Sequence, residues 1–195
     1  MDVIEGELNP EFKEMLDNFT DWFFQQDRNL IKLQGKPDEN EYYTSEEYHD
    51  SIYWDMHIGY PLHSYGNDLT QTSSTPEDWR KTILQFNKDL NGYLCSKFNA
   101  VMMYYPENGF MGWHDNRNVP GYNILLSYTE KGKGWFRYKR DGETITLNDK
   151  PGWNVKAGYY GGALEKDKQA RHCARSYEER LTFGFVTPEK FLWDM

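Results

Sequence analysis

Apolar residues recur at three- and four-residue spacing near the start of the chain, which is the pattern of a helix with one buried face. Asn9 suits the cap before this helix, Pro10 suits its first position, and Glu11 is favoured at its positively polarised end. From Gln26 to about Ser74 the pattern weakens, and charged, turn and aromatic residues predict long loops with one or two short strands. The buried stripe of the predicted helix consists of Phe12, Met15, Leu16, Phe19, Trp22 and Phe23.

A second helix is predicted to open at Thr75, because Thr75-Pro76-Glu77-Asp78 is close to a capping box. The irregular stretch between the two helices is unusually long, and such stretches often cover or rim a functional site. Its aromatic residues could stack on a substrate, although core packing is the expected role of most. The buried stripe of the second helix consists of Trp79, Ile83, Phe86, Leu90 and Leu94.

From Lys97 onward the pattern changes to short apolar segments separated by turn sequences such as PENG, VPG and NDKPG. Six or more strands at this spacing favour a sandwich or a barrel. We therefore expect a mainly β fold with N-terminal helices in a single domain, 1–195, divided into a helical and loop part (1–96) and a β core (97–187). The segments predicted as strands are 98–105, 122–129, 134–140, 143–147, 152–160 and 180–186.

Composition narrows the possible environments and partners. Seven Trp, fifteen Tyr and eleven Phe predict an aromatic-rich core. No apolar run is long enough to span a bilayer, and the acidic N-terminus lacks the layout of a secretory signal. Two cysteines, Cys95 and Cys173, fit a reducing cytoplasm better than a disulfide framework. A net charge of −9 disfavours broad attraction to nucleic acid.

The candidate chemistry lies in GWHDN at 112–116 and in RHCARSYEERLTFGF at 171–185. The ends of antiparallel strands could bring His114 and His172 together. Arg180 and Thr182 lie two apart on the last predicted strand, so their side chains share a face. An arginine that faces into a β core is costly unless it meets an anion, although a salt bridge with Glu178, Glu179 or another acid would also satisfy it. Two imidazoles and one oxygen ligand on one face of a metal would leave positions open for a cosubstrate and dioxygen.

The region from about 97 to 187 resembles the catalytic core of the Fe(II)/2-oxoglutarate-dependent dioxygenases, notably the prolyl-hydroxylase and AlkB-like branches and small viral members. The resemblance implies a double-stranded β-helix, that is, a cupin-like jelly roll. It also implies that His114 and His172 bind Fe(II) and that Arg180 binds the far carboxylate of 2-oxoglutarate. Tyr105 resembles the tyrosine that hydrogen-bonds this cosubstrate, and Thr182 resembles the small hydroxyl residue two positions after the arginine.

The third metal ligand departs from the family pattern. A His-x-Asp pair would need an acid at position 116, which is occupied by Asn116, whereas the acid is Asp115. The amide oxygen of Asn116 could be the third metal ligand, and the position of Asn116 two residues after His114 favours this choice. The backbone could instead bend so that Asp115 binds the metal, or two histidines could hold it with water or halide. Asp115 could also merely cap the turn around Asn118–Gly121.

The expected function is that of a cytoplasmic oxygenase that uses Fe(II), 2-oxoglutarate and O2 to hydroxylate a peptide, an amino acid or another small substrate. Succinate and CO2 would be the coproducts. One alternative is an AlkB-like nucleic-acid demethylase, which the acidic charge makes the less expected partner class. Another is a jelly roll that binds a ligand without catalysis. Neither a membrane partner nor a particular oligomeric state is indicated by the chain.

Overall fold

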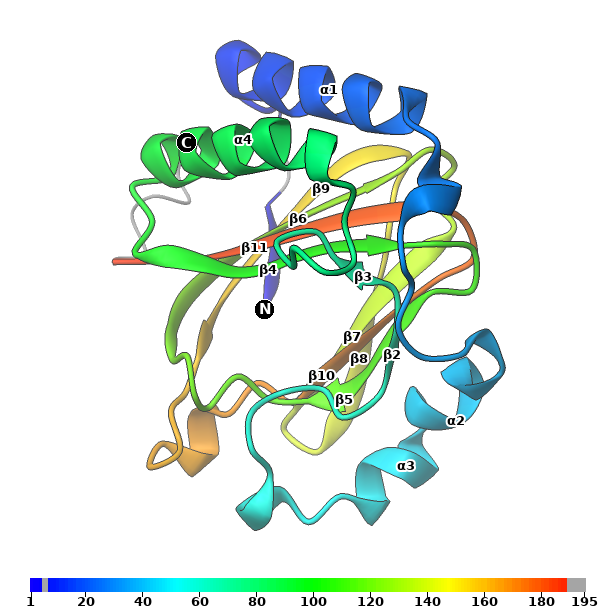
Figure 1. The fold of residues 1–195 in the computed structure, drawn as a ribbon. Coiled ribbons are helices and arrows are strands. Elements are labelled where there is room, and N and C mark those ends of the chain that lie inside the picture. Colours follow the sequence, from blue (N-terminus) through cyan, green and yellow to red (C-terminus); the bar gives the residue numbers. More distant parts are fainter. Residues whose placement is uncertain (5–6, 189–195) are drawn as a thin grey trace.

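The computed structural model describes residues 1–4 and 7–188, which build two facing antiparallel β-sheets with helices on their outer sides (Figure 1). The helices are α1 (Pro10–Gln25), α2 (Asn40–Tyr43), α3 (Glu46–Ser51) and α4 (Arg80–Tyr93). The strands are β1 (Asp2–Ile4), β2 (Ser64–Tyr65), β3 (Asn67–Asp68), β4 (Phe98–Tyr105), β5 (Phe110–His114), β6 (Gly121–Thr129), β7 (Gly134–Arg140), β8 (Glu143–Asn148), β9 (Gly152–Tyr160), β10 (His172–Ser176) and β11 (Arg180–Thr187).

The strand pairing defines a jelly roll. Strands β4 and β11, β5 and β10, β6 and β9, and β7 and β8 pair antiparallel, as in one long hairpin whose tip is the β7–β8 turn. This double strand is wound into a coil, because β11 also pairs with β6 and β10 also pairs with β7. The result is a sheet in the order β1-β9-β6-β11-β4-β3 opposite a sheet in the order β2-β5-β10-β7-β8. The predicted double-stranded β-helix with N-terminal helices is therefore confirmed.

Helices α1 and α4 cover the outer face of the six-stranded sheet (Figure 1). The predicted cap of α1 is confirmed, since the Asn9 side chain accepts hydrogen bonds from the backbone N–H groups of Glu11 and Phe12. Phe19 of α1 stacks on Phe86 of α4 with ring centroids 3.8 Å apart and meets the edge of Phe183 of β11. Each such buried aromatic ring contributes about 2 kcal/mol by its removal from water. The predicted helical stripes thus form the main core.

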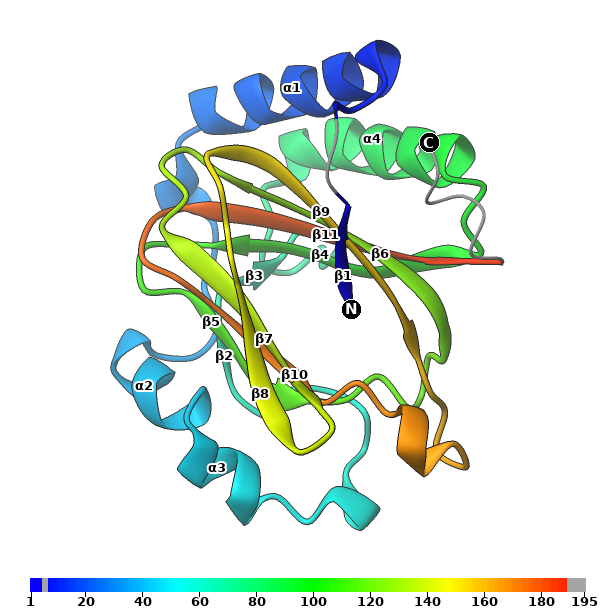
Figure 2. The same ribbon diagram turned by 180° about the vertical axis from the view of Figure 1, so that it is seen from behind.

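The alternation of side chains along a strand gives each sheet one face toward a helical layer and one face toward the interior. On β11, Leu181, Phe183 and Phe185 pack in the helical core, while Arg180 and Thr182 point between the sheets. On the five-stranded sheet, the outward residues Trp113, Trp135 and Cys173 pack with Tyr48 of α3. Figure 2 shows β1 beside β9, at the edge of the six-stranded sheet.

The segment between α1 and α4 differs from the prediction. One or two short strands were expected and two are present, β2 and β3, but the rest is not all loop, since it contains α2 and α3. Ser45 caps α3 by accepting a hydrogen bond from the N–H of Tyr48. These helices are too short to show a helical apolar period, which is why the pattern missed them. Four 3-10 turns also lie in this segment, at Arg28–Leu30, Pro37–Glu39, Trp54–Met56 and Glu77–Trp79.

The predicted start of the second long helix at Thr75 is wrong. The chain first makes a 3-10 turn at Glu77–Trp79, and α4 begins at Arg80. The 3-10 turn has Pro76 at its cap position and no side-chain cap, and the Thr75 hydroxyl points its proton toward Oδ1 of Asn67 and the carbonyl of Leu69. A buried hydroxyl can make tertiary hydrogen bonds in place of a capping hydrogen bond. The capping pattern in the sequence does not show which of the two forms.

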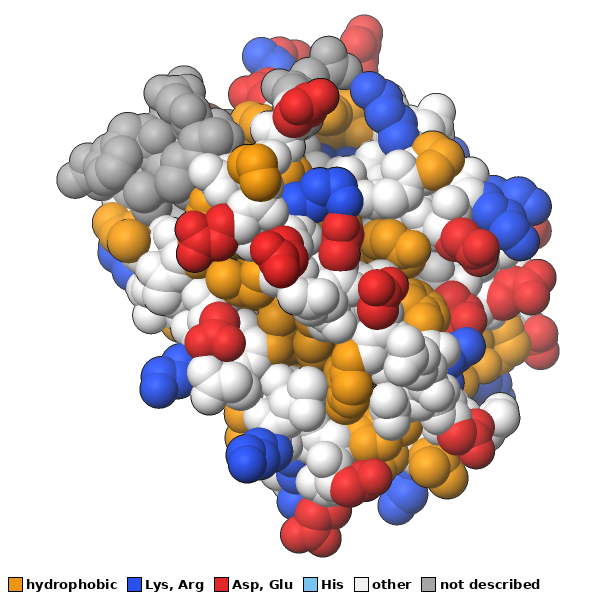
Figure 3. Space-filling view, turned by 90° about the horizontal axis from the view of Figure 1, so that it is seen from above, with side chains coloured by type: hydrophobic (Ala, Val, Ile, Leu, Met, Phe, Trp, Pro, Cys, Tyr) orange, Lys and Arg blue, Asp and Glu red, His pale blue; other side chains and the backbone are white. Residues whose placement is uncertain are grey.

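The face formed by α1 and α4 carries mixed charges. Figure 3 looks onto these helices and shows acidic and basic side chains interspersed around exposed apolar atoms. The described residues of this face form no broad positive patch, in agreement with the acidic net charge. Among the described residues, none of the helices combines the length and the apolar character needed to cross a bilayer.

Candidate active site

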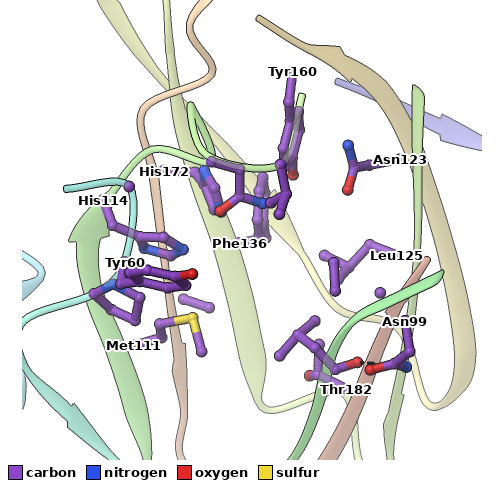
Figure 4. A pocket seen from close by; sticks show the side chains of 18 of the residues that line it. Tyr60, Asn99, Met111, His114, Asn123, Leu125, Phe136, Tyr160, His172 and Thr182 are labelled. Carbon is purple, nitrogen blue, oxygen red and sulfur yellow. Dashed lines mark hydrogen bonds between the residues drawn. The ribbon is translucent and has the colours of Figure 1, made fainter. Parts of the chain in front are cut away.

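A cavity of about 300 Å³ lies between the two sheets, which is at the lower end of the range of small-molecule sites (Figure 4). Its walls come from both sheets and from the loop before β2. The side chains that matter most for chemistry are those of Tyr105, His114, Asn116, His172, Arg180 and Thr182, all of which line it. The winding of the jelly roll has therefore brought all six sequence-predicted site residues to one cavity.

His114 and His172 face each other across the β5–β10 pair. Their Cα atoms are direct register partners, and their ring centroids are 4.1 Å apart. His114 closes β5 and His172 opens β10, so both imidazoles stand at the same end of the five-stranded sheet and point inward (Figure 4). The six segments predicted as strands did not include β5 or β10, each of which is only five residues long, although strand ends were expected to meet at His114 and His172.

The hydrogen bonds of the two imidazoles prepare both for a metal. The Nδ1 atom of His114 lies 2.9 Å from the carbonyl of Gly112, and that of His172 lies 2.6 Å from the carbonyl of Ala170. Because a carbonyl only accepts, Nδ1 of each ring carries the proton and Nε2 keeps its lone pair. Burial lowers the pKa of His172 to about 4 and lowers that of His114 well below its ordinary value. Both rings are thus neutral at pH 7, as a metal requires.

The two candidates for the third ligand are placed differently. Asn116 lines the cavity, whereas Asp115 points away from it into a closed polar contact. Both oxygens of Asp115 are engaged by Arg117, with Nη2 2.7 Å from Oδ2 and Nε 3.0 Å from Oδ1. Oδ1 also accepts from the backbone N–H of Arg117 and lies 3.7 Å from Nδ1 of His57. Burial alone would raise the pKa of Asp115, but the nearby His57 and the hydrogen bonds and positive charge of Arg117 outweigh this effect and lower the pKa.

Arg180 supplies the positive charge of the cavity. Its side chain is 1% exposed, and it is the only Lys, Arg, Asp or Glu that lines the cavity within residues 1–4 and 7–188. Its Nη1 donates to the carbonyl of Trp135 at 3.4 Å, while its Nε and Nη2 have no hydrogen-bond partner among the described residues. Buried N–H groups of this kind are rare and favour an anionic ligand. Glu178 and Glu179 contact other groups, namely backbone N–H groups of Lys131 and Lys133, and Arg28. Another acid, Asp149, does lie beside Arg180, with Oδ2 3.4 Å from Nη2, so the predicted alternative of a salt bridge is present, although it leaves N–H groups of Arg180 without hydrogen bonds among the described residues.

Tyr105 and Thr182 flank Arg180 on the same inward face. The guanidinium carbon of Arg180 lies 6.0 Å from the centre of the Tyr105 ring. The hydroxyl of Tyr105 donates to a weak acceptor, Sδ of Met111 at 3.8 Å, and burial raises its pKa, so the hydroxyl stays protonated. The Thr182 hydroxyl has no partner in the described part of the chain. Both hydroxyls can therefore donate to an anion held by Arg180.

Two buried charged residues were not anticipated. Asp149 precedes β9 and contacts Arg180, and Lys156 of β9 contacts Asp149. A signal for Lys156 was present, because it shares the inward face of its strand with Tyr160, a cavity residue. No signal singled out Asp149, since an aspartate in the turn sequence NDKPG is ordinary.

The other histidines lie outside the cavity. His57 contacts Asp115, and His63 stacks on Tyr43 with ring centroids 3.7 Å apart. His49 forms a possible metal-binding group with Glu46 and Asp50, but none of the three lines the cavity. Of the aromatic residues between α1 and α4, Tyr60 lines the cavity and is largely exposed, while Tyr48 is core.

Comparison with known proteins gives two distant structural likenesses. No family model matches the chain, and neither does any curated protein. The chain is similar to a Pseudomonas putida prolyl-4-hydroxylase, with 15% identity over 89% of this chain and 99% of that one and a TM-score of 0.38. It is also similar to a full-length Neurospora crassa protein in complex with alpha-KG, with 11% identity over 94% and 73% and a TM-score of 0.41. At TM-scores below 0.5, neither likeness bears on the chemistry of the site.

Proposed function

We propose that the protein is an Fe(II)- and 2-oxoglutarate-dependent oxygenase that hydroxylates a peptide, an amino acid or another small substrate. The observation that carries the proposal is the meeting of two kinds of group in one cavity. Two neutral imidazoles present Nε2 lone pairs, and a buried guanidinium presents unpartnered N–H groups within the described part of the chain. A metal would satisfy the first and a carboxylate would satisfy the second.

The donor set fits iron with one departure. His114 and His172 would hold the metal, and Asn116, which lines the same cavity, would supply its amide oxygen as the third ligand. Arg180 would pair with the far carboxylate of 2-oxoglutarate, and Tyr105 and Thr182 would donate to it. When bound, Fe(II) with 2-oxoglutarate and O2 supplies the oxidation of a C–H bond, with succinate and CO2 as coproducts.

The chain itself would contribute position and exclusion of water. The backbone carbonyls of Gly112 and Ala170 hold the two rings in one tautomer and one orientation. Apolar walls that include Leu125, Phe136 and Tyr160 keep the interior dry, which strengthens the attraction between Arg180 and a carboxylate (Figure 4).

A jelly roll that binds its ligand without catalysis is the second candidate. The structure offers one observation in its favour: the acid beside His114 is Asp115, and its carboxylate is already paired with Arg117. An amide is a weaker ligand than a carboxylate for a hard cation, so iron retention by this site is the property that separates the two candidates.

The test is conversion of 2-oxoglutarate to succinate by purified protein, with and without Fe(II). We expect iron-dependent succinate formation, which His172→Ala abolishes together with iron retention in a metal titration. His63→Ala is the matched control, because that histidine lies outside the cavity. Retained ligand binding with no succinate would favour the binding module, and full iron affinity in His172→Ala would remove the proposed metal site.

A further inference from the structure

The proposed function leaves unexplained a pair of fully buried charges next to Arg180. Nζ of Lys156 lies 2.8 Å from Oδ1 of Asp149 and 3.2 Å from the hydroxyl of Ser127. The other carboxylate oxygen of Asp149, Oδ2, lies 3.4 Å from Nη2 of Arg180. The side chains of Lys156 and Arg180 are each 1% exposed and that of Asp149 is 0% exposed. Neither Asp149 nor Lys156 lines the cavity, so both lie behind Arg180.

The three residues form a cluster with one unbalanced positive charge, because two cations share a single carboxylate. Burial would raise the pKa of Asp149, but Arg180 and Lys156 outweigh this and lower it, so the carboxylate is ionised. Burial lowers the pKa of Lys156; the attraction of Asp149 opposes the effect, and Arg180 adds to it. A buried surplus charge is expensive for a fold unless a counter-ion arrives.

The surplus positive charge is located at Arg180, the residue of the cluster that lines the cavity. Asp149 makes a short hydrogen bond to Lys156, whereas its 3.4 Å approach to Arg180 does not have hydrogen-bond geometry. Nη2 and Nε of Arg180 are accordingly without partners in the described residues. Without Lys156, the same carboxylate would be free to close a one-to-one pair with Arg180, as buried aspartate–arginine pairs do.

We propose that Lys156 and Asp149 are positioning residues of the anion site: Lys156 engages Asp149, and this leaves the Arg180 guanidinium free and net positive for the distal carboxylate of a dicarboxylate ligand. The inference rests on the proposed function for the identity of that ligand, 2-oxoglutarate. It adds that affinity for the ligand depends on the charge balance of a three-residue cluster of which only Arg180 touches the cavity.

The charge balance makes a prediction that a packing role does not make. Lys156→Met leaves one cation and one carboxylate, so the surplus is lost and Arg180 turns to Asp149. Asp149→Asn leaves two cations and keeps a free Arg180. The double variant Lys156→Met/Asp149→Asn leaves one cation, Arg180, and restores the surplus of the wild-type cluster. Adding Asp149→Asn to Lys156→Met is therefore expected to restore the ligand affinity that Lys156→Met alone removes.

The experiment measures dissociation constants by calorimetry, with 2-oxoglutarate on protein loaded with Mn(II) and with glutarate on metal-free protein. We expect Lys156→Met to weaken both ligands by about tenfold or more, the effect of removing one unit of charge from a poorly solvated site. The double variant should return to within about threefold of the wild type. Lys156→Arg, which keeps the charge, should stay close to the wild type. Lys13→Met is the matched control, because Lys13 pairs with Asp17 on the exposed side of α1.

An unchanged affinity in folded Lys156→Met overturns the inference, and so does a double variant that binds no better than that single variant. Circular dichroism establishes folding; if the methionine variant does not fold, Lys156→Gln with Asp149→Asn gives the same comparison. Dicarboxylate binding that follows the charge balance, without succinate formation, supports the inference and removes the proposed oxygenase. If succinate forms but the dissociation constant does not change in the Lys156 variants, the oxygenase proposal is supported and the inference about Lys156 is overturned. If the wild type binds neither dicarboxylate, the oxygenase proposal and the inference are both overturned.

Discussion

The two aspartates Asp115 and Asp149 are both fully buried, yet the structure pairs them in opposite ways. Asp115 meets one arginine, Arg117, which engages both of its oxygens and whose Nη2 also donates to the carbonyl of Trp54 and to the side chain of Gln169. Asp149 is shared by Lys156 and Arg180, and N–H groups of Arg180 stay without partners among the described residues. In the first group one cation meets one carboxylate and both carboxylate oxygens are engaged; in the second, two cations share one carboxylate, and Oδ2 of Asp149 accepts no hydrogen bond among the described residues.

This difference separates a structural ion pair from a binding site. A closed pair gains nothing from a ligand and loses much when one partner is removed. An open cluster has already lost the solvation of its surplus charge, so an anion that reaches it restores a missing interaction. The positions of the two groups agree with these different roles, because Arg180 of the open cluster lines the cavity and Asp115 of the closed pair does not.

The largest expected effect is on ligand binding by the open cluster. Arg180→Met should weaken 2-oxoglutarate binding by about 100-fold, since two charge-assisted hydrogen bonds are lost. The free energy of unfolding should change by less than about 1 kcal/mol, because the variant leaves the neutral pair Asp149–Lys156 behind. Calorimetry and chemical denaturation give the two numbers. A dissociation constant within about threefold of the wild type would contradict the role of Arg180.

The closed pair should show the opposite behaviour. Asp115→Asn leaves Arg117 without its counter-charge, and we expect the free energy of unfolding to fall by about 2 kcal/mol, less than for a fully enclosed pair because Arg117 is partly exposed. Binding of 2-oxoglutarate should stay within about twofold. Chemical denaturation measures the first effect and calorimetry the second. Loss of iron retention in this variant would instead identify Asp115 as the third metal ligand.

The same variant has a characteristic pH dependence. The pKa of Asp115 is lower in the folded protein than its ordinary value of 3.8, so the unfolded chain takes up the proton first as the pH falls. The carboxylate therefore contributes stability that is complete above about pH 4 and is lost as the pH falls further. Asp115→Asn should lack this part of the acid sensitivity, and parallel acid-denaturation curves for the two proteins would contradict the expectation.

The smallest expected effect concerns the metal. Asn116→Asp places a carboxylate at the cavity-lining position, and we expect Fe(II) affinity to rise by about tenfold, since a charged oxygen is a better ligand for a hard cation than an amide. Metal titration of this variant beside the wild type measures the change. Unaltered affinity in a folded Asn116→Asp would show that position 116 does not reach the metal.

Local patterns accounted for much of the secondary structure. The cap at Asn9 and the stripes of α1 and α4 follow from side-chain chemistry within one or two turns, and 98–105, 134–140 and 152–160 coincide with β4, β7 and β9. Strands β5 and β10 were not among the predicted segments, although strand ends were expected at the two histidines, because five residues are too few to show a clear period. Their identity depends on pairing with each other across about 60 residues of chain.

The sequence by itself determined which residues could do chemistry: two histidines, an arginine and a threonine two positions beyond it. It also determined that Arg180 and Thr182 share a face, because strand alternation is local. Only the tertiary structure decided that Asn116 lines the cavity while Asp115 is tied to Arg117, and that Asp149 and Lys156 stand behind Arg180. The physical reason is that an ion pair forms between whichever charges the winding of the sheets buries together, and this depends on contacts far apart in the chain.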